Sequence, residues 1–312
     1  MKMDHVFFPA FSRVAISGGT HGNELSGVHI VREMQKHNVN QMGSLSVCPI
    51  LSNPRSIEVC RRYIDTDLNR CFTDALLSTP LTDSSSCELR RAHELNALLG
   101  PKGSDRAMDL VCDLHNTTSN MGLCFIIDFL DWILLHMVKY VQIKMPTAPI
   151  RVINTNVASK SLSYSVDSVA KHGFAIEVGP QPHGVLRADI YNMMKEAVDH
   201  TLDWLNKFNA GTTFEGDKVE VFVWEKSVDY PRDPETSQLT AVIHPKLQDN
   251  DFKLLQHGNP IFKTFTGETV NYEGEDLYPF FINECAYYEK RIAFHLAKKE
   301  TIAFPPISVK KE

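Results

Sequence analysis

The chain has 312 residues, of which 43% are hydrophobic and 22% charged, and its formal net charge is −6. These values are typical of a globular protein, and an acidic chain without a lysine or arginine block argues against a nucleic-acid partner. The longest apolar run, residues 122–141, contains Asp128, Asp131, His136 and Lys139, charges that a membrane span of this length excludes. We therefore expect no transmembrane segment, and the lack of a signal-peptide pattern predicts a cytoplasmic protein.

Apolar strand-like runs alternate with segments of helical period through the first two-thirds of the chain. Strands are predicted at residues 13–17, 45–51, 110–115, 123–128, 150–154 and 174–178, and helices at 27–36, 88–99, 131–142 and 189–209. Gly100-Pro101 is expected to end the second helix, and Asp189 to cap the N-terminus of the last one. This alternation favours an α/β fold with a parallel or mixed sheet covered on both faces.

The pattern of residue types changes near residue 210. Beyond that point short β-type runs are separated by Pro, Gly, Asn and Asp, which is typical of a small β-rich domain. We therefore predict a catalytic α/β domain at residues 1–211 and a β-rich C-terminal domain at residues 212–312.

Two Lewis bases follow a glycine turn in the stretch GGTHGNELSG, residues 18–27. His21 and Glu24 come directly after a predicted buried strand, and His115 ends another one in DLVCDLHNTTSN. Because functional groups of α/β sheets gather beyond the strand carboxyl ends, the three side chains are expected at one edge of the sheet. Two histidines and a glutamate suit Zn²⁺ with one open position, so the pattern predicts a hydrolytic zinc site.

Two further carboxylates stand near these strand ends. Asp113 shares a strand face with His115, and it is either a hydrogen-bond acceptor that fixes the tautomer of the histidine or a capping carboxylate. Glu177 lies near the end of an apolar strand in FAIEVGPQP, where burial of a carboxylate is costly unless it is used. We expect it to be the general base, the alternative being a salt-bridged structural glutamate.

The segment RRYIDTDLNRCF, residues 61–72, concentrates charge. It is either a solvated loop or a site in which arginines bind a substrate carboxylate in bidentate fashion and stabilise an oxyanion.

Taken in order, GGTHGNE, RRYIDTDLNR, DLHNTTSNMG, EVGPQPHGVLRADI, VDYPRD, HPKLQDNDF and NECAYYEK resemble the aspartoacylase/aminoacylase III group of zinc carboxypeptidase-like amidohydrolases. The resemblance covers residues 13–294 and implies one Zn²⁺ per subunit, a mixed-sheet α/β fold and a homo-oligomer, dimer or tetramer. It also implies peripheral association with the apical membrane in some relatives. By position it implies zinc ligands at His21, Glu24 and His115, and Glu177 as the base and proton shuttle.

The resemblance also implies contacts with an N-acyl amino acid. Arg62 matches the arginine that polarises the scissile carbonyl, Asn69 and Arg70 match the pair that binds the α-carboxylate, and Tyr164 and Tyr287 match tyrosines of the substrate pocket. Tyr287 would narrow the entrance against peptides. Without the resemblance, the alternative interpretation of Tyr287 is a core aromatic residue next to Tyr288.

The sequence departs from aspartoacylase at one informative place. Aspartoacylases pair the aspartate side chain of the substrate with an arginine shortly after the tyrosine matched by Tyr164, but here no arginine occurs between Lys160 and Lys171, and Asp167 stands roughly in its place. An aspartate would repel such a carboxylate, so the chain resembles the branch that deacetylates N-acyl aromatic amino acids and mercapturic acids. Aspartoacylase activity remains the alternative if Lys160 or Lys171 supplies the cation. A carboxypeptidase and a non-catalytic binding protein are the other classes considered.

Overall fold

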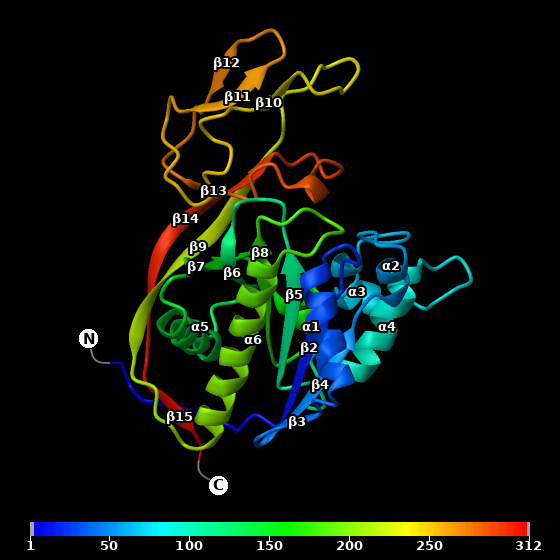
Figure 1. Ribbon diagram of the computed structural model, residues 1–312, viewed down its shortest axis with the longest axis vertical. Coiled ribbons are helices and arrows are strands. Elements are labelled where there is room, and N and C mark those ends of the chain that lie inside the picture. Colours follow the sequence, from blue (N-terminus) through cyan, green and yellow to red (C-terminus); the bar gives the residue numbers. More distant parts are fainter. Residues whose placement is uncertain (1–2, 311–312) are drawn as a thin grey trace.

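The computed structural model describes residues 3–310, and a ten-stranded mixed sheet forms its centre (Figure 1). The strands of this sheet are β2 (Arg13–Gly18), β3 (Gln41–Met42), β4 (Leu45–Leu51), β5 (Leu110–Asn116), β6 (Gly122–Ile127), β7 (Ile150–Asn154), β8 (His172–Gly179), β9 (Asp217–Val228), β13 (Tyr278–Phe280) and β14 (Phe294–Phe304). They are ordered β13-β14-β9-β7-β6-β8-β5-β2-β4-β3. All six predicted strands are present.

The sheet changes direction between β8 and β6. Strands β4, β2, β5 and β8 are parallel, β6 is antiparallel to β8, and β7 and β9 continue parallel to β6. The carboxyl ends of β2, β5 and β8 therefore meet at one edge. The expected mixed-sheet α/β fold is confirmed.

Helices cover both faces of the sheet. The helices are α1 (Leu25–Lys36), α2 (Pro54–Glu58), α3 (Asp74–Leu77), α4 (Cys87–Leu99), α5 (Trp132–Lys144) and α6 (Ala188–Asn209). Figure 1 shows α1, α5 and α6 together on one side of the sheet. Their apolar sides pack against it to form the main core, which includes Phe125 of the sheet and Trp204 of α6. A second core forms where α4 packs near Ala15 and Val111 on the opposite face. Among residues 3–310, no helix combines the length and apolarity needed to cross a bilayer.

Side chains at the helix starts explain where these helices begin. The Ser86 hydroxyl accepts a hydrogen bond from the Leu89 N–H at the start of α4, and Asp131 caps α5 through the Ile133 N–H. The prediction that Asp189 caps the last helix is wrong, because α6 begins one residue earlier with Arg187 at the cap position. Asp189 lies in the first turn, where its charge favours the positive helix end, and pairs with Arg187 at 2.6 Å.

The chain beyond residue 211 builds both a small lobe and part of the main sheet. A three-stranded antiparallel sheet of β10 (Ala241–Ile243), β11 (Pro260–Thr264) and β12 (Thr269–Asn271) forms the upper lobe in Figure 1. Strands β9 and β14 pair along the whole of β14, and β9 also pairs with β7. Strands β1 (Val6–Phe8) and β15 (Ile307–Val309) join the two ends of the chain in a parallel pair.

Candidate active site

The turn after β2 positions the first two candidate ligands. Gly19 has φ +72°, a conformation that residues with a side chain rarely adopt. A Cβ at Gly22 would lie 2.1 Å from the carbonyl carbon of Ser56, so only glycine fits. Glu24 then occupies the N-cap position of α1, but its side chain makes no capping hydrogen bond and its carboxylate accepts from Asn116 N at the end of β5 instead.

His21, Glu24 and His115 lie together and are buried. His21 Nδ1 is 2.7 Å from Glu24 Oε1, His115 Nδ1 is 3.0 Å from Glu24 Oε2, and the two Nδ1 atoms are 3.2 Å apart. Three ligand atoms thus converge within 4.8 Å of one another, as three protein ligands to one ion would.

Carboxylates hold the outer nitrogen of both histidines. Asp67 Oδ1 lies 3.0 Å from His21 Nε2, and Asp113 Oδ2 lies 2.7 Å from His115 Nε2. Each carboxylate accepts the Nε2 proton, which leaves the Nδ1 lone pair free toward the shared point. Asp113 therefore makes the hydrogen bond considered in the first of its two sequence interpretations.

Arg62 joins the candidate ligand Glu24 to Asp67. Its Nη1 donates to Glu24 Oε1 at 3.2 Å and its Nη2 to Asp67 Oδ2 at 3.1 Å. Burial opposes ionisation of both carboxyls, but contacts with His21, together with His115 for Glu24 and Arg62 for Asp67, outweigh it and lower the pKa of Glu24 and of Asp67. Lys290 Nζ also donates to Asp67, at 2.9 Å. Asp67 is thus the acceptor at the centre of this polar network.

Glu177 lies beside His115. The two residues are register partners on the parallel strands β8 and β5, and the glutamate is only 8% exposed. Its Oε1 atom has no hydrogen-bond partner among the described residues. Burial first, and then the charge of Glu24, raise the pKa of Glu177 well above its ordinary value. A desolvated carboxylate with a free oxygen is suited to accept a proton.

Asn69, Arg70 and Tyr164 form one wall of the site. The Arg70 guanidinium stacks over the Tyr164 ring, 4.4 Å from its centroid, and the Asn69 side-chain oxygen accepts the Val166 N–H at 3.0 Å. Asn69 and Arg70 belong to a short 3₁₀ helix, Leu68–Arg70, capped by Asp67. The structure therefore brings the predicted carboxylate-binding pair beside the segment that contains Asp167.

Glu284 ties the loop of Tyr287 to the main sheet. Its Oε2 accepts from Thr118 N at 2.7 Å and from the hydroxyls of Thr117 and Thr118, while its Oε1 accepts from Ala286 N at 3.0 Å. Burial opposes ionisation, but these donors and His183 hold the pKa of Glu284 at about 2. Tyr287 packs against Phe281 and lines the site.

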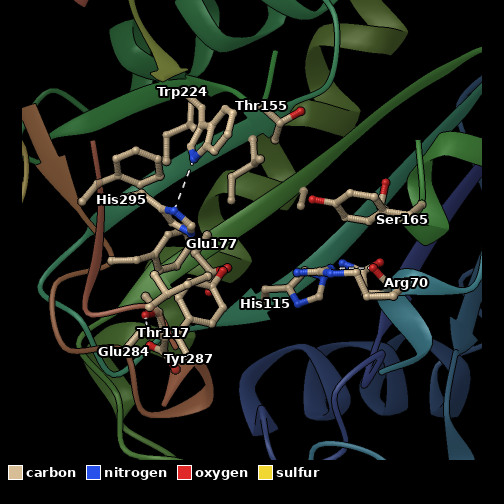
Figure 2. Close-up of a pocket in the computed structure, with 18 of the residues that line it drawn as sticks. Arg70, His115, Thr117, Thr155, Ser165, Glu177, Trp224, Glu284, Tyr287 and His295 are labelled. Carbon is tan, nitrogen blue, oxygen red and sulfur yellow. Dashed lines mark hydrogen bonds between the residues drawn. The ribbon is translucent and has the colours of Figure 1, made fainter. Parts of the chain in front are cut away.

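The candidate ligands, Glu177 and the substrate-binding candidates line a cavity of about 520 Å³ (Figure 2), a size typical of small-molecule sites. Asp128 and Asp167 line it, as do aromatic side chains of the C-terminal segment. Neither aspartate has a cationic partner within 4.0 Å among the described residues. Burial first, and then the neighbouring Asp128 charge, raise the pKa of Asp167 to about 7.

The two lysines that could have replaced the missing arginine lie elsewhere. Lys171 Nζ pairs with Asp109 Oδ1 at 2.8 Å, outside the cavity. Lys160 is exposed, and both lysines line a separate small pocket that shares Asp167 and Asp128 with the main cavity. All nine predicted site residues, in contrast, line the 520 Å³ cavity; they are His21, Glu24, Arg62, Asn69, Arg70, His115, Tyr164, Glu177 and Tyr287.

Several residues of the site carry no distinctive sequence signal. Asp67 lies in a charged stretch of sequence, 46 residues from His21, and only the fold reveals that the two side chains are in contact. Trp224 and His295 come from β9 and β14, and nothing in their sequence context marks them as pocket residues. Glu284 lies in the NECAYYEK motif, so its proximity to Tyr287 was the one available signal.

Comparison with known proteins agrees with this geometry. Residues 10–205 match the family model of the succinylglutamate desuccinylase/aspartoacylase catalytic domain, and residues 217–299 match the AstE/AspA barrel-sandwich hybrid domain. The mixed-sheet α/β fold and the buried His-Glu-His cluster, which could bind a metal ion, are those of a metal-dependent enzyme family. The chain belongs to the succinylglutamate desuccinylase/aspartoacylase family, as its motifs predicted.

Two sequence relatives and one solved structure locate the chain within this family. An N-acyl-aromatic-L-amino acid amidohydrolase (carboxylate-forming) A of Danio rerio is 59% identical over 99% of this chain and 95% of the relative. An aspartoacylase of Mus musculus is 45% identical over 93% of this chain and 94% of its own length. The crystal structure of murine aminoacylase 3 superposes with a TM-score of 0.93 at 41% identity, covering 96% of this chain and 99% of that one.

Proposed function

We propose that this protein is a zinc-dependent amidohydrolase of N-acyl aromatic L-amino acids, including mercapturic acids, which it converts to a carboxylate and a free amino acid. The observation that carries the proposal is the buried convergence of His21, Glu24 and His115 beside Glu177, in a cavity whose Arg70 and Asn69 can bind a carboxylate. The 59% identity to a relative named for this activity, against 45% to an aspartoacylase, supports the choice of branch.

The donor set fits a zinc ion. Two imidazole nitrogens with their outer nitrogens held by Asp67 and Asp113, together with one carboxylate, are the borderline donors that zinc prefers. Zinc held by His21, Glu24 and His115 would supply a Lewis acid for the scissile carbonyl and for the attacking water.

The side chains around these ligands perform the proton transfers and hold the developing charge. Glu177 accepts the proton of the water that attacks the acyl carbon, and its free Oε1 and raised pKa support this assignment. Arg62 donates toward the carbonyl oxygen as it becomes an oxyanion. Glu177 then passes the same proton to the amine nitrogen as the C–N bond breaks, so a free amine and a carboxylate leave.

Substrate binding follows from the charges that line the cavity. Arg70 and Asn69 bind the α-carboxylate, Tyr164 holds the Arg70 guanidinium in place, and Tyr287 contacts the substrate. Asp167, with Asp128 beside it, disfavours a second carboxylate on the side chain of the substrate. An uncharged aromatic or thioether side chain meets no such repulsion.

A rate assay with three substrates tests the proposal. The zinc-loaded protein should hydrolyse N-acetyl-tyrosine and an S-benzyl mercapturate, and should turn over N-acetyl-aspartate at least tenfold more slowly. A chelator should abolish all activity, and zinc should restore it. Faster hydrolysis of N-acetyl-aspartate would overturn the substrate assignment but not the zinc mechanism. Activity that survives metal removal would overturn the mechanism itself.

Cellular context and assembly complete the proposal. We infer a cytoplasmic homo-oligomer, either a dimer or a tetramer, with one zinc per subunit. Light scattering of the purified protein measures the number of subunits, and parallel metal analysis measures the zinc content per subunit. A monomer would refute the proposed oligomer.

A further inference from the structure

The C-terminal segment lines one end of the cavity with aromatic side chains. We call this end, formed by Trp224, Phe280, Phe281 and His295, the aromatic lobe. The His295 ring centroid is 5.3 Å from that of Phe280 and 6.1 Å from that of Phe281. The imidazole of His295 lies among these aromatic rings, with the Ser227 hydroxyl beside it.

Trp224 fixes which nitrogen of His295 carries the proton. The indole Nε1–H of Trp224 donates to His295 Nδ1 at 3.3 Å, and the Ser227 hydroxyl lies 2.9 Å from the same nitrogen. An indole can only donate, so Nδ1 must be an acceptor. A neutral His295 therefore carries its proton on Nε2. Figure 2 shows this second nitrogen on the edge of the ring turned away from Trp224, on the side of Glu177.

The imidazole also stays neutral in the physiological range. Burial first, and then the charges of Arg70 and Lys290, lower the pKa of His295 to about 4. The aromatic lobe thus presents one uncharged N–H donor. No hydrogen bond joins Nε2 to another described residue, so that donor is available to a molecule in the cavity.

The position of the lobe indicates which part of a substrate reaches it. In Figure 2, Arg70 lies on one side of His115 and Glu177, and His295 lies on the other. A substrate with its α-carboxylate on Arg70 and its amide carbonyl beside His115 extends its acyl group away from Arg70. The acyl group then points toward His295 and Trp224.

We propose that the aromatic lobe is the acyl-group pocket, and that His295 makes it selective for uncharged acyl groups carrying a hydrogen-bond acceptor beyond the carbonyl. This inference rests on the proposed amidohydrolase function and specifies the acyl groups that the same site accepts. A mostly aromatic wall with an unpartnered, neutral His295 N–H favours an ether or similar oxygen over a methylene, because the N–H is otherwise left without a hydrogen-bond partner among the described residues.

Two acyl groups of equal size provide the test. N-methoxyacetyl-L-tyrosine and N-butyryl-L-tyrosine differ by one ether oxygen in place of one methylene, and the ratio of their kcat/KM values is measured in each variant. Comparing ratios between variants cancels the intrinsic reactivity of the two amides. His295→Leu should lower the ratio by about fivefold, the discrimination that one ordinary hydrogen bond supplies. His295→Gln should retain it, because a carboxamide can accept from Trp224 and donate into the cavity.

Two further variants and one NMR measurement distinguish loss of the His295 donor from a general disturbance of the pocket. Ser227→Ala should keep the ratio, because the Trp224 bond alone fixes the tautomer. Trp224→Phe should lower it, and this variant serves if His295→Leu does not fold. Nitrogen-15 NMR of the wild-type protein should report the Nε2–H tautomer for His295.

Distinct results would overturn the inference. An unchanged ratio in a folded His295→Leu, or an Nδ1–H tautomer, would refute it while leaving the amidohydrolase activity intact. A change in the preference between N-acetyl-tyrosine and N-acetyl-phenylalanine, with the acyl ratio unchanged, would assign the lobe to the amino-acid side chain instead. Lack of any hydrolysis by the zinc-loaded wild type would refute the proposed function and the inference together.

Discussion

Asp113 and His115 point to the same face of β5, and their Oδ2 and Nε2 atoms are 2.7 Å apart. Alternation along the strand explains the shared face. Asp113 is itself held by the hydroxyls of Ser17, at 2.6 Å, and Thr20, at 2.8 Å. The carboxylate is therefore fixed before any ion arrives, and with it the orientation of the His115 ring.

Replacing this carboxylate should weaken metal binding. Asp113→Asn is expected to reduce zinc affinity by about 10- to 100-fold, because the amide is a poorer acceptor for the Nε2 proton and leaves the ring less basic. Competition with a chromophoric chelator measures the affinity. Asp109→Asn, at an aspartate that pairs with Lys171 outside the cavity, is the matched control and should bind zinc normally. Equal affinities for the two variants would contradict the role of Asp113.

Removing the base should separate catalysis from metal binding. In Glu177→Gln the side chain keeps its shape but cannot accept a proton, so kcat should fall by about 10²- to 10⁴-fold. Zinc content and melting temperature should change little, since Glu177 is not among the three converging ligands. Steady-state kinetics with metal analysis on the same sample make the comparison. A variant that keeps more than a tenth of the activity would mean that another group is the base.

The carboxylate-binding role of Arg70 can be tested by removing the carboxylate from the substrate. Wild-type protein should prefer N-acetyl-tyrosine over N-acetyl-tyrosinamide by about 10- to 100-fold, because the amide loses a charged hydrogen bond. Arg70→Met should lose that preference, and the two changes together form a double-mutant cycle. An Arg70→Met protein with an undiminished preference for the free acid would assign the carboxylate to a different cation.

Discrimination against N-acetyl-aspartate should depend on pH through Asp167. Burial, and then Asp128 and Asp113, raise the pKa of Asp167 to about 7, so its carboxyl is charged above that pH and neutral below it. Lowering the pH from 8 to 6 removes a negative charge from the cavity. The rate on N-acetyl-aspartate relative to N-acetyl-tyrosine should therefore rise by about tenfold, the effect of one nearby like charge.

Asp167→Asn provides the control for this pH effect. Its relative rate on N-acetyl-aspartate should already be high at pH 8 and should not change between pH 8 and pH 6. If wild type and variant showed parallel pH profiles, titration of another group would be responsible.

Glu284 should contribute stability that disappears in acid. Its pKa falls from 4.5 to about 2 on folding, so the contribution is complete above pH 4.5 and is lost as the pH falls toward 2. The shift corresponds to about 3 kcal/mol at pH 7. Urea unfolding of Glu284→Gln should show this loss at pH 7 and a smaller difference from wild type at pH 3. Glu275→Gln, at an exposed glutamate, should be neutral; equal stability of wild type and Glu284→Gln at pH 7 would contradict the assignment.

The strands and the metal-ligand cluster could be predicted because their signals are local. Apolar runs of five to seven residues marked β4, β5 and β7, and the polar residues directly after β2 and β5 pointed to a common sheet edge. Glu177 stood out because a lone carboxylate in an apolar strand is costly. Roles for Arg70 and Tyr287 came from the family resemblance, since neither spacing nor composition distinguishes them from other surface or core residues.

Pairings between distant segments could not be predicted. Asp67 meets His21 across 46 residues, and Trp224 meets His295 across 71, so the contacts depend on the complete fold. The same reason explains why the composition change near residue 210 did not reveal how β9 and β14 extend the main sheet. The Asp189 prediction was wrong because acidic residues are favoured both at the cap and in the first turn of a helix.

The long β9–β14 pair, which has one register shift between Leu296 and Ala297, makes the aromatic lobe part of the main sheet. Trp224 and His295 lie on strands that are hydrogen-bonded, through β9, to β7, so this wall cannot swing outward like a hinged lid without unzipping backbone pairs. We therefore expect turnover without a rigid-body closure of the aromatic lobe. For the same reason, we expect denaturant to unfold the aromatic lobe and the rest of the main sheet in a single cooperative transition.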